Sequence, residues 1–340
     1  MDKMLNIALI GPGRMGVNYA RVVVQNPDAN LVAVCGNTIE TTEKNAASFN
    51  VPLYYNNEWE KMLAQHPEID TVIIATSERA HLAPFISCLK AGKNIILEKP
   101  IAVEIAEYEQ MANLALQYPQ SKIFVCFTCR FDNRYYHAKK LIDTGKLGNP
   151  GYIYSRRNAD QRIASRIIGK FSPTYWIIVH DIDLMRWMTN SEVTEVTAFE
   201  SAILTDGNFL SVRLLFENGT TGQIESTFYS KPISGQEHTR MDVECENGKI
   251  EIQLSHGGLF SYHTDSGLDT PDVNDFVENH GTFTGNTPSM INHFINVLKG
   301  KASPVVGFND GLAAVKVSTA IERSIREKCT ISMSNRNLNS

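Results

Sequence analysis

The fold of the first part of the chain is decided by the stretch LNIALIGPGRMG, residues 5–16. An apolar run leads directly into three glycines, Gly11, Gly13 and Gly16, in the spacing Gly-x-Gly-x-x-Gly. A strand followed by a glycine turn and a helix is the context that a dinucleotide-binding loop requires. Gly11 would make the tight turn, Gly13 would let the main chain approach a diphosphate, and Gly16 would let the helix pack closely on the strand. We therefore expect this loop, with Arg14 and Met15 at the helix N-terminus, to bind NAD or NADP.

The alternation of predicted strands and helices continues to residue 127. Continuous apolar runs predict strands buried on both faces, at residues 4–10, 31–35, 71–75, 94–97 and 122–127. Helical spacing fills the intervals, at residues 14–25, 38–49, 58–65, 81–90 and 103–118. This alternation predicts an α/β domain with a parallel sheet, an NAD(P)-binding Rossmann domain over residues 1–127.

The spacing of apolar residues changes after residue 127. From residue 193 onward long alternating runs dominate, separated by Asn218-Gly219 and Asn247-Gly248, the dipeptides that tight hairpins prefer. Further elements are expected as helices at residues 131–142, 288–298 and 311–326 and as a half-buried strand at residues 152–157. We predict for residues 128–340 an α+β domain with a mainly antiparallel sheet, which binds substrate and forms oligomers. Its last helix can pack back on the first domain.

Composition and charge exclude several classes of protein. The 340 residues include 32 Lys plus Arg against 37 Asp plus Glu, a formal charge of −5 that gives no basis for binding nucleic acid. The apolar runs are far shorter than the ~20 residues of a membrane-spanning helix, and no secretory signal pattern is visible. Six scattered cysteines predict reduced thiols rather than disulfides. We expect a cytoplasmic protein without nucleic-acid or membrane partners.

No metal site is expected. Cys126 and Cys129 have the spacing of a ligand pair, but they end a strand, and no second pair of cysteines or cluster of histidines with ligand spacing accompanies them. Burial is the better interpretation of these thiols.

The residues about 20 positions beyond the glycine loop bear on cofactor choice. An NAD-preferring loop usually has Asp or Glu there, and this chain has Cys35-Gly36-Asn37-Thr38. Without a carboxylate nothing repels a 2′-phosphate, and Asn37, Thr38 and the amide of Gly36 could donate hydrogen bonds to one. The pattern favours NADP over NAD, with a cofactor-tolerant NAD(P) site as the alternative.

A second chemical motif follows the predicted strand at residues 94–97. Ligands of open parallel sheets bind at the carboxyl ends of the strands, and Glu98-Lys99-Pro100 lies there. Pro100 restricts Lys99 to an extended conformation, and a lysine desolvated beside a cofactor can exchange the proton that accompanies hydride transfer. Taken alone, the tripeptide is better interpreted as a strand end with a surface lysine.

Several spaced motifs together resemble the glucose–fructose oxidoreductase, inositol dehydrogenase and MocA family of NAD(P)-dependent oxidoreductases. The resemblance spans nearly the whole chain and is carried by Gly11-x-Gly13-x-x-Gly16, Ala75-Thr76-Ser77-x-x-x-His81, Ala91-Gly92-Lys93, Glu98-Lys99-Pro100, Gly145-Lys146-Leu147-Gly148 and His180-Asp181-Ile182-Asp183-Leu184. It implies a nicotinamide-binding domain followed by an open-faced antiparallel sheet. It also implies hydride transfer at a carbon of a sugar, inositol or related polyol.

The resemblance also implies roles for single residues. Lys99 matches the lysine that acts on the reacting hydroxyl or carbonyl, and His180 matches the active-site histidine. Glu98 and Pro100 are expected to seat the nicotinamide, with Thr76 and His81 beside the cofactor. His180 independently suits acid–base work because its ordinary pKa lies near neutrality.

One position departs from the family pattern. Many polyol-oxidising members have Asp four residues before the histidine, where this chain has Trp176. Trp176 could stack on a sugar ring, and Tyr175 or Asp181 could supply a polar partner, or the aromatic residues could belong to the core. The trio of Lys, Asp and His is therefore incomplete, which leaves the substrate and the proton relay open.

Arg156 and Arg157 precede this motif. With Arg162 and Arg166 they form a basic cluster in an acidic protein, which could bind a phosphate or carboxylate of the substrate, including the diphosphate of a nucleotide sugar. The alternative is a solvated loop with surface ion pairs.

The leading hypothesis is an NAD(P)-dependent oxidoreductase for a sugar, cyclitol or nucleotide-sugar hydroxyl or carbonyl. One alternative is a nicotinamide-dependent glycoside hydrolase of the same fold, and another is a non-catalytic NAD(P)-binding sensor. An open sheet face predicts a homodimer or homotetramer, with Phe209, Val212 and Leu214 as candidate interface residues.

Overall fold

The computed structural model describes residues 3–160, 172–201, 203, 209–230, 238–254, 261–263, 267–269 and 273–333. The chain divides into two compact units. Unit 1 consists of residues 1–131 and 274–312, and unit 2 of residues 132–273 and 313–340. The sequence placed a single boundary after residue 127, whereas here residues 274–312 return to the first unit.

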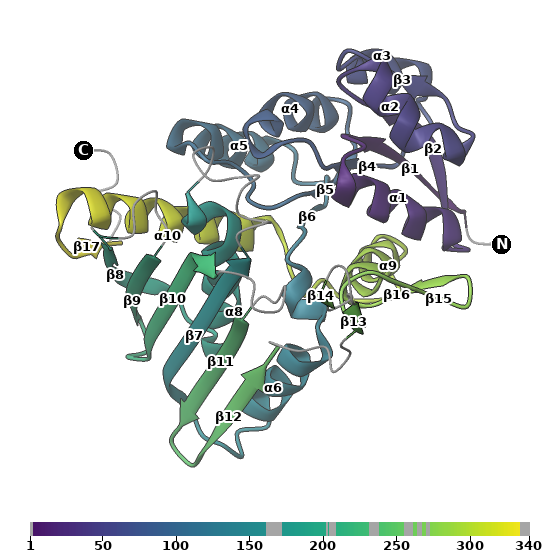
Figure 1. The fold of residues 1–340 in the computed structure, drawn as a ribbon. Helices are drawn as coiled ribbons and strands as arrows, with labels where there is room; N and C mark the ends of the chain where they lie inside the picture. The colour runs from purple at the N-terminus through teal and green to yellow at the C-terminus, as the bar shows by residue number, and fades with distance from the viewer. Residues whose placement is uncertain are drawn as a thin grey trace. The chain divides into compact units, whose positions relative to one another are not determined.

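Unit 1 is built on a six-stranded parallel sheet, as the sequence predicted. Its strand order is β3-β2-β1-β4-β5-β6 (Figure 1). The strands are β1 (Leu5–Ile10), β2 (Ala29–Cys35), β3 (Leu53–Tyr54), β4 (Thr71–Ile74), β5 (Asn94–Leu97) and β6 (Ile123–Val125). Every residue of β4 is buried, which explains why its sequence is a continuous apolar run rather than an alternating one.

Helices connect and cover these strands, and α1, α3 and α4 pack against them. The helices of unit 1 are α1 (Arg14–Gln25), α2 (Ile39–Ala46), α3 (Trp59–Gln65), α4 (Leu82–Lys90), α5 (Ile105–Gln117) and α9 (Asn286–Leu298), with short 3-10 turns η1 (Ala47–Phe49), η2 (Glu78–Ala80) and η3 (Thr128–Phe131) and the hairpin β15 (Val277–Asn279) and β16 (Thr282–Thr284). The returning helix α9 joins the core because Phe294 stacks on Phe124 of β6, with ring centroids 4.8 Å apart. The side-chain nitrogen Nδ2 of Asn26 also donates to Oδ1 of Asn292 at 2.8 Å.

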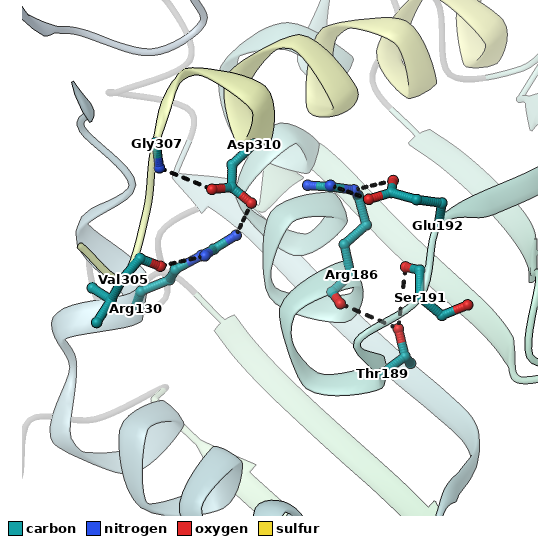
Figure 2. Close-up of polar contacts among 8 residues, drawn as sticks. All are labelled: Arg130, Arg186, Thr189, Ser191, Glu192, Val305, Gly307 and Asp310. Atoms are coloured by element: carbon teal, nitrogen blue, oxygen red, sulfur yellow. Dashed lines mark hydrogen bonds and ion pairs between the residues drawn. The ribbon is translucent and has the colours of Figure 1, made fainter. Parts of the chain in front are cut away.

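A buried arginine fixes the start of α10 (Phe308–Glu327) within unit 1. Arg130 of η3 donates to the carbonyl of Val305 at 2.6 Å and to Asp310 at 2.8 Å (Figure 2). The second carboxylate oxygen of Asp310 accepts from the Gly307 amide at 2.9 Å. α10 continues from this anchored end into unit 2.

Unit 2 is built on a mainly antiparallel sheet, again as predicted. In the described part of the chain the strand order is β12-β11-β7-β10-β9-β8-β17, and only the β7–β10 pairing in this order is parallel. The strands are β7 (Pro150–Asp160), β8 (Val193–Glu200), β9 (Phe209–Phe216), β10 (Thr221–Ser230), β11 (His238–Cys245), β12 (Gly248–Gln253) and β17 (Ile331–Ser332), and a separate hairpin is formed by β13 (Ser261–His263) and β14 (Gly267–Asp269). The predicted Asn218-Gly219 turn joins β9 to β10, with Gly219 at φ 87°.

Helices cover one face of this sheet (Figure 1). α6 (Asn133–Asp143) contacts α8 (Val179–Thr189), and α8 contacts β7; a π-helical turn, η4 (Thr174–Ile178), precedes α8. The alternation of β9 buries Val212 and Leu214 completely on the covered face. These two residues therefore belong to the core of unit 2, which corrects the expectation that they lie in an oligomer interface.

The end of α8 is held by a second arginine. Arg186 forms two hydrogen bonds with Glu192, at 2.7 and 2.5 Å, and its carbonyl accepts from the Thr189 hydroxyl at 3.3 Å (Figure 2). Asn190 then ends the helix in the left-handed region, at φ 48°. Among the helices of the described residues, none is long and apolar enough to cross a bilayer.

Candidate functional site

The three loop glycines each have a different structural reason. Gly11 adopts φ +93°, and a Cβ there would lie 2.6 Å from the main chain of Ala75 and Thr76. A Cβ on Gly16 would lie 2.2 Å from the carbonyl oxygen of Gly11, so only glycine lets α1 approach the turn so closely. Gly13 has φ −76°, and among the described residues no atom would lie within 4 Å of its Cβ. The space above Gly13 is therefore open.

This open space fits a dinucleotide diphosphate. Gly13 is the N-cap of α1 and Arg14 its first residue, and both are exposed. Within the described part of the chain no side chain caps this helix end, so its first amides point outward with the positive end of the helix dipole behind them. A Cβ at residue 13 would fill the cradle that the phosphates need. The sequence-predicted loop, with Met15 half-buried, thus has the uncapped helix end and the open space that a phosphate-binding turn requires.

The end of β2 shapes the region expected to meet the adenosine ribose. The Gly36 amide donates to the carbonyl of Tyr54 at 2.9 Å, so it is not the donor to a 2′-phosphate that the sequence suggested. Asn37 is exposed, and its side-chain oxygen Oδ1 accepts from the side-chain nitrogen Nδ2 of Asn57 at 3.1 Å. The side-chain nitrogen Nδ2 of Asn37 therefore remains as the donor for a ribose hydroxyl or a phosphate. The hydroxyl of Thr38 accepts from the Thr41 amide and caps α2.

His81 links the loops that follow β4 and β5. Its Nδ1 lies 3.0 Å from the carbonyl oxygen of Pro100 and its Nε2 lies 3.3 Å from that of Thr76. The residue is 1% exposed, and burial lowers the pKa of its imidazole. The sequence placed His81 beside the cofactor. In the structure its ring contacts the carbonyl oxygens of Thr76 and Pro100 and so links these two loops.

Lys99 is the second residue after the end of β5, as predicted, and its peptide bond to Pro100 is cis. The neighbouring Glu98 accepts a hydrogen bond from the Tyr19 hydroxyl at 2.8 Å, and its other oxygen contacts the amide of Lys99. Burial raises the pKa of the Glu98 carboxyl, and burial also raises that of the Tyr19 phenol. Tyr19, on α1, was missed by the sequence analysis. Its only signal is its place three residues beyond Gly16 on the buried side of α1.

The second candidate group lies in unit 2. His180 is half-exposed in the first turn of α8, directly after the π-helical turn that carries Tyr175 and Trp176. Tyr175 and Trp176 are also half-exposed, and the Tyr175 hydroxyl lies 3.2 Å from that of Thr319 on α10. Lys99 and His180 belong to different units.

Asp181 is sealed in a buried polar network. It accepts from Arg157 Nε at 2.8 Å, from Arg157 Nη2 at 3.1 Å and from the Ser155 hydroxyl at 2.6 Å. Arg157 Nη2 also donates to the hydroxyl of Tyr135 at 3.2 Å. The exposed fractions of Ser155, Asp181 and Tyr135 are zero and that of Arg157 is 7%. This network joins β7, α6 and α8, and sequence reasoning found only its two charged members.

The predicted basic cluster is therefore corrected. Arg156 and Arg157 are neighbours on β7, so their side chains leave opposite faces of the sheet. Arg156 is exposed on the open face, whereas Arg157 is buried against Asp181. The other two members, Arg162 and Arg166, lie outside the described residues.

Comparison with known proteins identifies the family of both parts of the chain. Residues 5–125 match the GFO/IDH/MocA oxidoreductase family with an NAD-binding Rossmann fold. Residues 135–251 match the C-terminal domain of the same family.

Full-length relatives and solved structures agree with this match. The inositol 2-dehydrogenase of Rhizobium meliloti is 26% identical over 336 residues, covering 97% of this chain and 99% of the relative. The scyllo-inositol 2-dehydrogenase (NAD(+)) of Bacillus subtilis is 25% identical and covers 96% of this chain and 95% of its own. The scyllo-inositol dehydrogenase of Lactobacillus casei, solved with NAD(H) and scyllo-inositol, has a TM-score of 0.79 at 21% identity, with 97% and 99% coverage. The myo-inositol 2-dehydrogenase of Lactobacillus plantarum has a TM-score of 0.81 at 21% identity and the same coverage. At these identities the solved structures establish the fold.

Proposed function

The chain belongs to the GFO/IDH/MocA oxidoreductase family, and on that premise we propose that it transfers hydride between a nicotinamide dinucleotide and a carbinol carbon of a cyclitol or related sugar. The observation that carries the proposal is the open cradle at Gly13, in the same unit as Lys99, the second residue after the end of β5. The relatives' names, inositol and scyllo-inositol 2-dehydrogenase, support a cyclitol as substrate.

The proton chemistry falls to Lys99 and His180. When bound, the nicotinamide supplies the hydride acceptor in oxidation and the hydride donor in reduction. In oxidation, the neutral amine of Lys99 takes the proton of the substrate hydroxyl as its carbon becomes a carbonyl, and the reverse reaction returns that proton. His180 hydrogen-bonds the reacting oxygen and assists the transfer. Glu98 and Pro100 seat the nicotinamide and fix the backbone that carries Lys99.

The cofactor site is proposed to accept both NAD and NADP. The name of the Bacillus subtilis relative favours NAD. The absence of a carboxylate from the sequence Gly36-Asn37-Thr38 favours NADP, because nothing there repels a 2′-phosphate. No Arg stands in this stretch to select the phosphate, so the two preferences offset each other.

Assembly and location complete the proposal. The open face of the unit 2 sheet carries Tyr152 and Phe199, which are 39% and 66% exposed. We propose that the protein forms a homodimer or homotetramer through this face.

All six cysteines are free thiols, which is typical of a reducing compartment, so the proposed location is the cytoplasm.

Turnover assays with a substrate panel test the proposed function. Incubation with NAD or NADP and myo-inositol, scyllo-inositol, aldoses or nucleotide sugars should produce reduced cofactor with at least one polyol. Release of an aglycone from a glycoside without net cofactor reduction would instead support the hydrolase alternative. Cofactor binding with no turnover on the whole panel would support the sensor.

A further inference from the structure

A buried tyrosine links the helix of the glycine loop to the candidate lysine. Tyr19 lies on α1, three residues after Gly16, and has no exposed surface. Its hydroxyl donates to Oε1 of Glu98 at 2.8 Å. The other carboxylate oxygen of Glu98, Oε2, accepts from the main-chain amide of Lys99. The Glu98 side chain thus connects α1 to the backbone of the lysine.

The two hydrogen bonds fix the orientation of the Glu98 carboxylate. Burial raises the pKa of the Tyr19 phenol, so the phenol keeps its proton at neutral pH and acts as the donor. The Lys99 amide can only donate, so Glu98 accepts at both of its oxygens. A carboxylate bonded at one oxygen can still turn about its last torsion, which is a soft one. The second bond, from Tyr19, restricts that rotation.

The residue on the other side of Lys99 is anchored separately. The carbonyl oxygen of Pro100 lies 3.0 Å from Nδ1 of the buried His81. Glu98 is also tied to the sheet, because its own amide donates at 2.9 Å to the carbonyl of the last residue of β4. Lys99 therefore lies between two neighbours that are each held by hydrogen bonds, and its half-exposed side chain starts from a fixed backbone.

The helix that carries Tyr19 also carries the proposed diphosphate cradle. Gly13 is the N-cap of α1, and Tyr19 lies six residues later, about 9 Å along the helix axis. A Cβ on Gly16 would lie 2.2 Å from the carbonyl oxygen of Gly11, so α1 is packed closely on the turn. A cofactor held at the N-terminus of α1 and a lysine held through Tyr19 are therefore tied to the same helix.

We infer that Tyr19 is a positioning residue for the proposed hydride transfer, which acts through Glu98 to hold the backbone of Lys99 where its amine meets the reacting oxygen. The inference rests on the proposed function and deepens it, because it gives the buried side of α1 a part in the proton transfer. Tyr19 has no exposed surface and does not itself touch the substrate. Its loss should slow turnover without weakening cofactor binding.

The first test removes one hydroxyl from the full-length protein. Tyr19→Phe keeps the aromatic ring and should lower kcat for the best cyclitol at least about fivefold, because displacement of a reacting group by about 1 Å can cost about 10² in rate. NADH affinity, measured by fluorescence, should stay unchanged. Tyr54→Phe is the matched control and should keep the wild-type kcat, since it removes another buried phenol of unit 1, which donates to Gln65 at 2.7 Å.

A second background separates positioning of the lysine from a structural effect. In Lys99→Ala the amine is gone, so adding Tyr19→Phe should leave the residual kcat unchanged. Glu98→Ala removes the link itself, so adding Tyr19→Phe to that variant should also cause no further loss. A merely structural role of Tyr19 would lower kcat by the same factor with and without Lys99, which would overturn the inference.

Failure of this inference is distinguishable from failure of the proposed function. If the wild type turns over no cyclitol or sugar with either cofactor, the proposed function fails and this inference fails with it. If the wild type is active and Tyr19→Phe loses less than about fivefold in kcat, only this inference is overturned. It is also overturned if NADH affinity falls as much as kcat, since Tyr19 would then serve the cofactor site rather than Lys99.

Discussion

Arg157 meets Asp181 through two hydrogen bonds, Nε to Oδ2 at 2.8 Å and Nη2 to Oδ1 at 3.1 Å, at a place where the Asp181 side chain has no exposed surface. The pair joins β7 to the first turn of α8, next to His180. A bidentate pair fixes both the distance and the orientation of the two elements. The position of the candidate histidine therefore depends on a contact made by its neighbour in sequence.

Breaking this pair should strongly destabilise the protein. Asp181→Asn leaves the Arg157 charge buried with a weaker partner, and loss of one member of a buried pair typically costs about 3–5 kcal/mol. Denaturant unfolding of the variant measures the loss. Asp242→Asn is the control, since its partner Arg240 is 44% exposed and surface pairs contribute at most about 1 kcal/mol. Equal effects of the two substitutions would contradict the assignment of Asp181 to the core.

Two alanine substitutions in the glycine loop should separate binding from folding. Gly13→Ala puts a methyl group into open space, so stability should change little while the affinity for NADH falls at least tenfold. Gly16→Ala forces a methyl group against the Gly11 carbonyl and should lower the free energy of unfolding by about 1–3 kcal/mol. Fluorescence titration and thermal unfolding give the two readouts. A Gly13→Ala variant that binds NADH normally would argue against the proposed cradle.

Lys99→Ala should abolish most turnover without abolishing cofactor binding. A group that transfers a proton in the transition state usually contributes about 10² to 10⁴ in rate. Steady-state kinetics and NADH titration measure the two effects. Lys90→Ala, at the exposed end of α4, is the matched control and should retain activity. Unchanged kcat in Lys99→Ala would remove this lysine from the mechanism.

Asn37→Asp should shift cofactor preference towards NAD. A carboxylate at this exposed position can accept hydrogen bonds from ribose hydroxyls and repel a 2′-phosphate. One like-charge contact of about 1.4 kcal/mol changes the ratio of kcat/KM values about tenfold. The measurement is the ratio for NAD over NADP in variant and wild type. An unaltered ratio would place the ribose away from Asn37.

His81 should make the stability of unit 1 fall in mild acid. Burial lowers the pKa of its imidazole, so the unfolded chain takes up the proton first as the pH falls. The contribution of the neutral ring is fully present above about pH 6.5, the ordinary value, and is lost as the pH falls through the lower pKa of the folded state. In urea unfolding, the advantage of wild type over His81→Asn should shrink between about pH 8 and pH 5. A constant advantage would contradict a buried neutral His81.

The elements that the sequence predicted well are those with a local pattern. Continuous apolar runs marked β1, β2, β4, β5 and β6, and the glycine spacing marked the turn into α1. β3 was missed because Leu53 and Tyr54 are too short a run to show a period. The return of residues 274–312 to unit 1 depends on contacts such as Phe294 on Phe124, which no local pattern reveals.

The candidate site was predictable in part for the same reason. Lys99 was placed by the strand before it, but the Tyr19–Glu98 hydrogen bond joins residues 79 positions apart. The opposite directions of Arg156 and Arg157 were available from the predicted strand itself, since neighbours on a strand alternate. The π turn before His180 was not, because its five residues have no sequence signature that separates π from α.

Deuterium transfer tests the central claim most directly. Myo-inositol and scyllo-inositol carrying deuterium on the carbinol carbons are incubated with the wild-type protein and NAD, and the reduced cofactor is examined by mass spectrometry. Hydride transfer predicts one deuterium in each molecule of NADH and slower turnover than with unlabelled substrate. Reduced cofactor without the label, or label released to water, would contradict a dehydrogenase acting on that carbon.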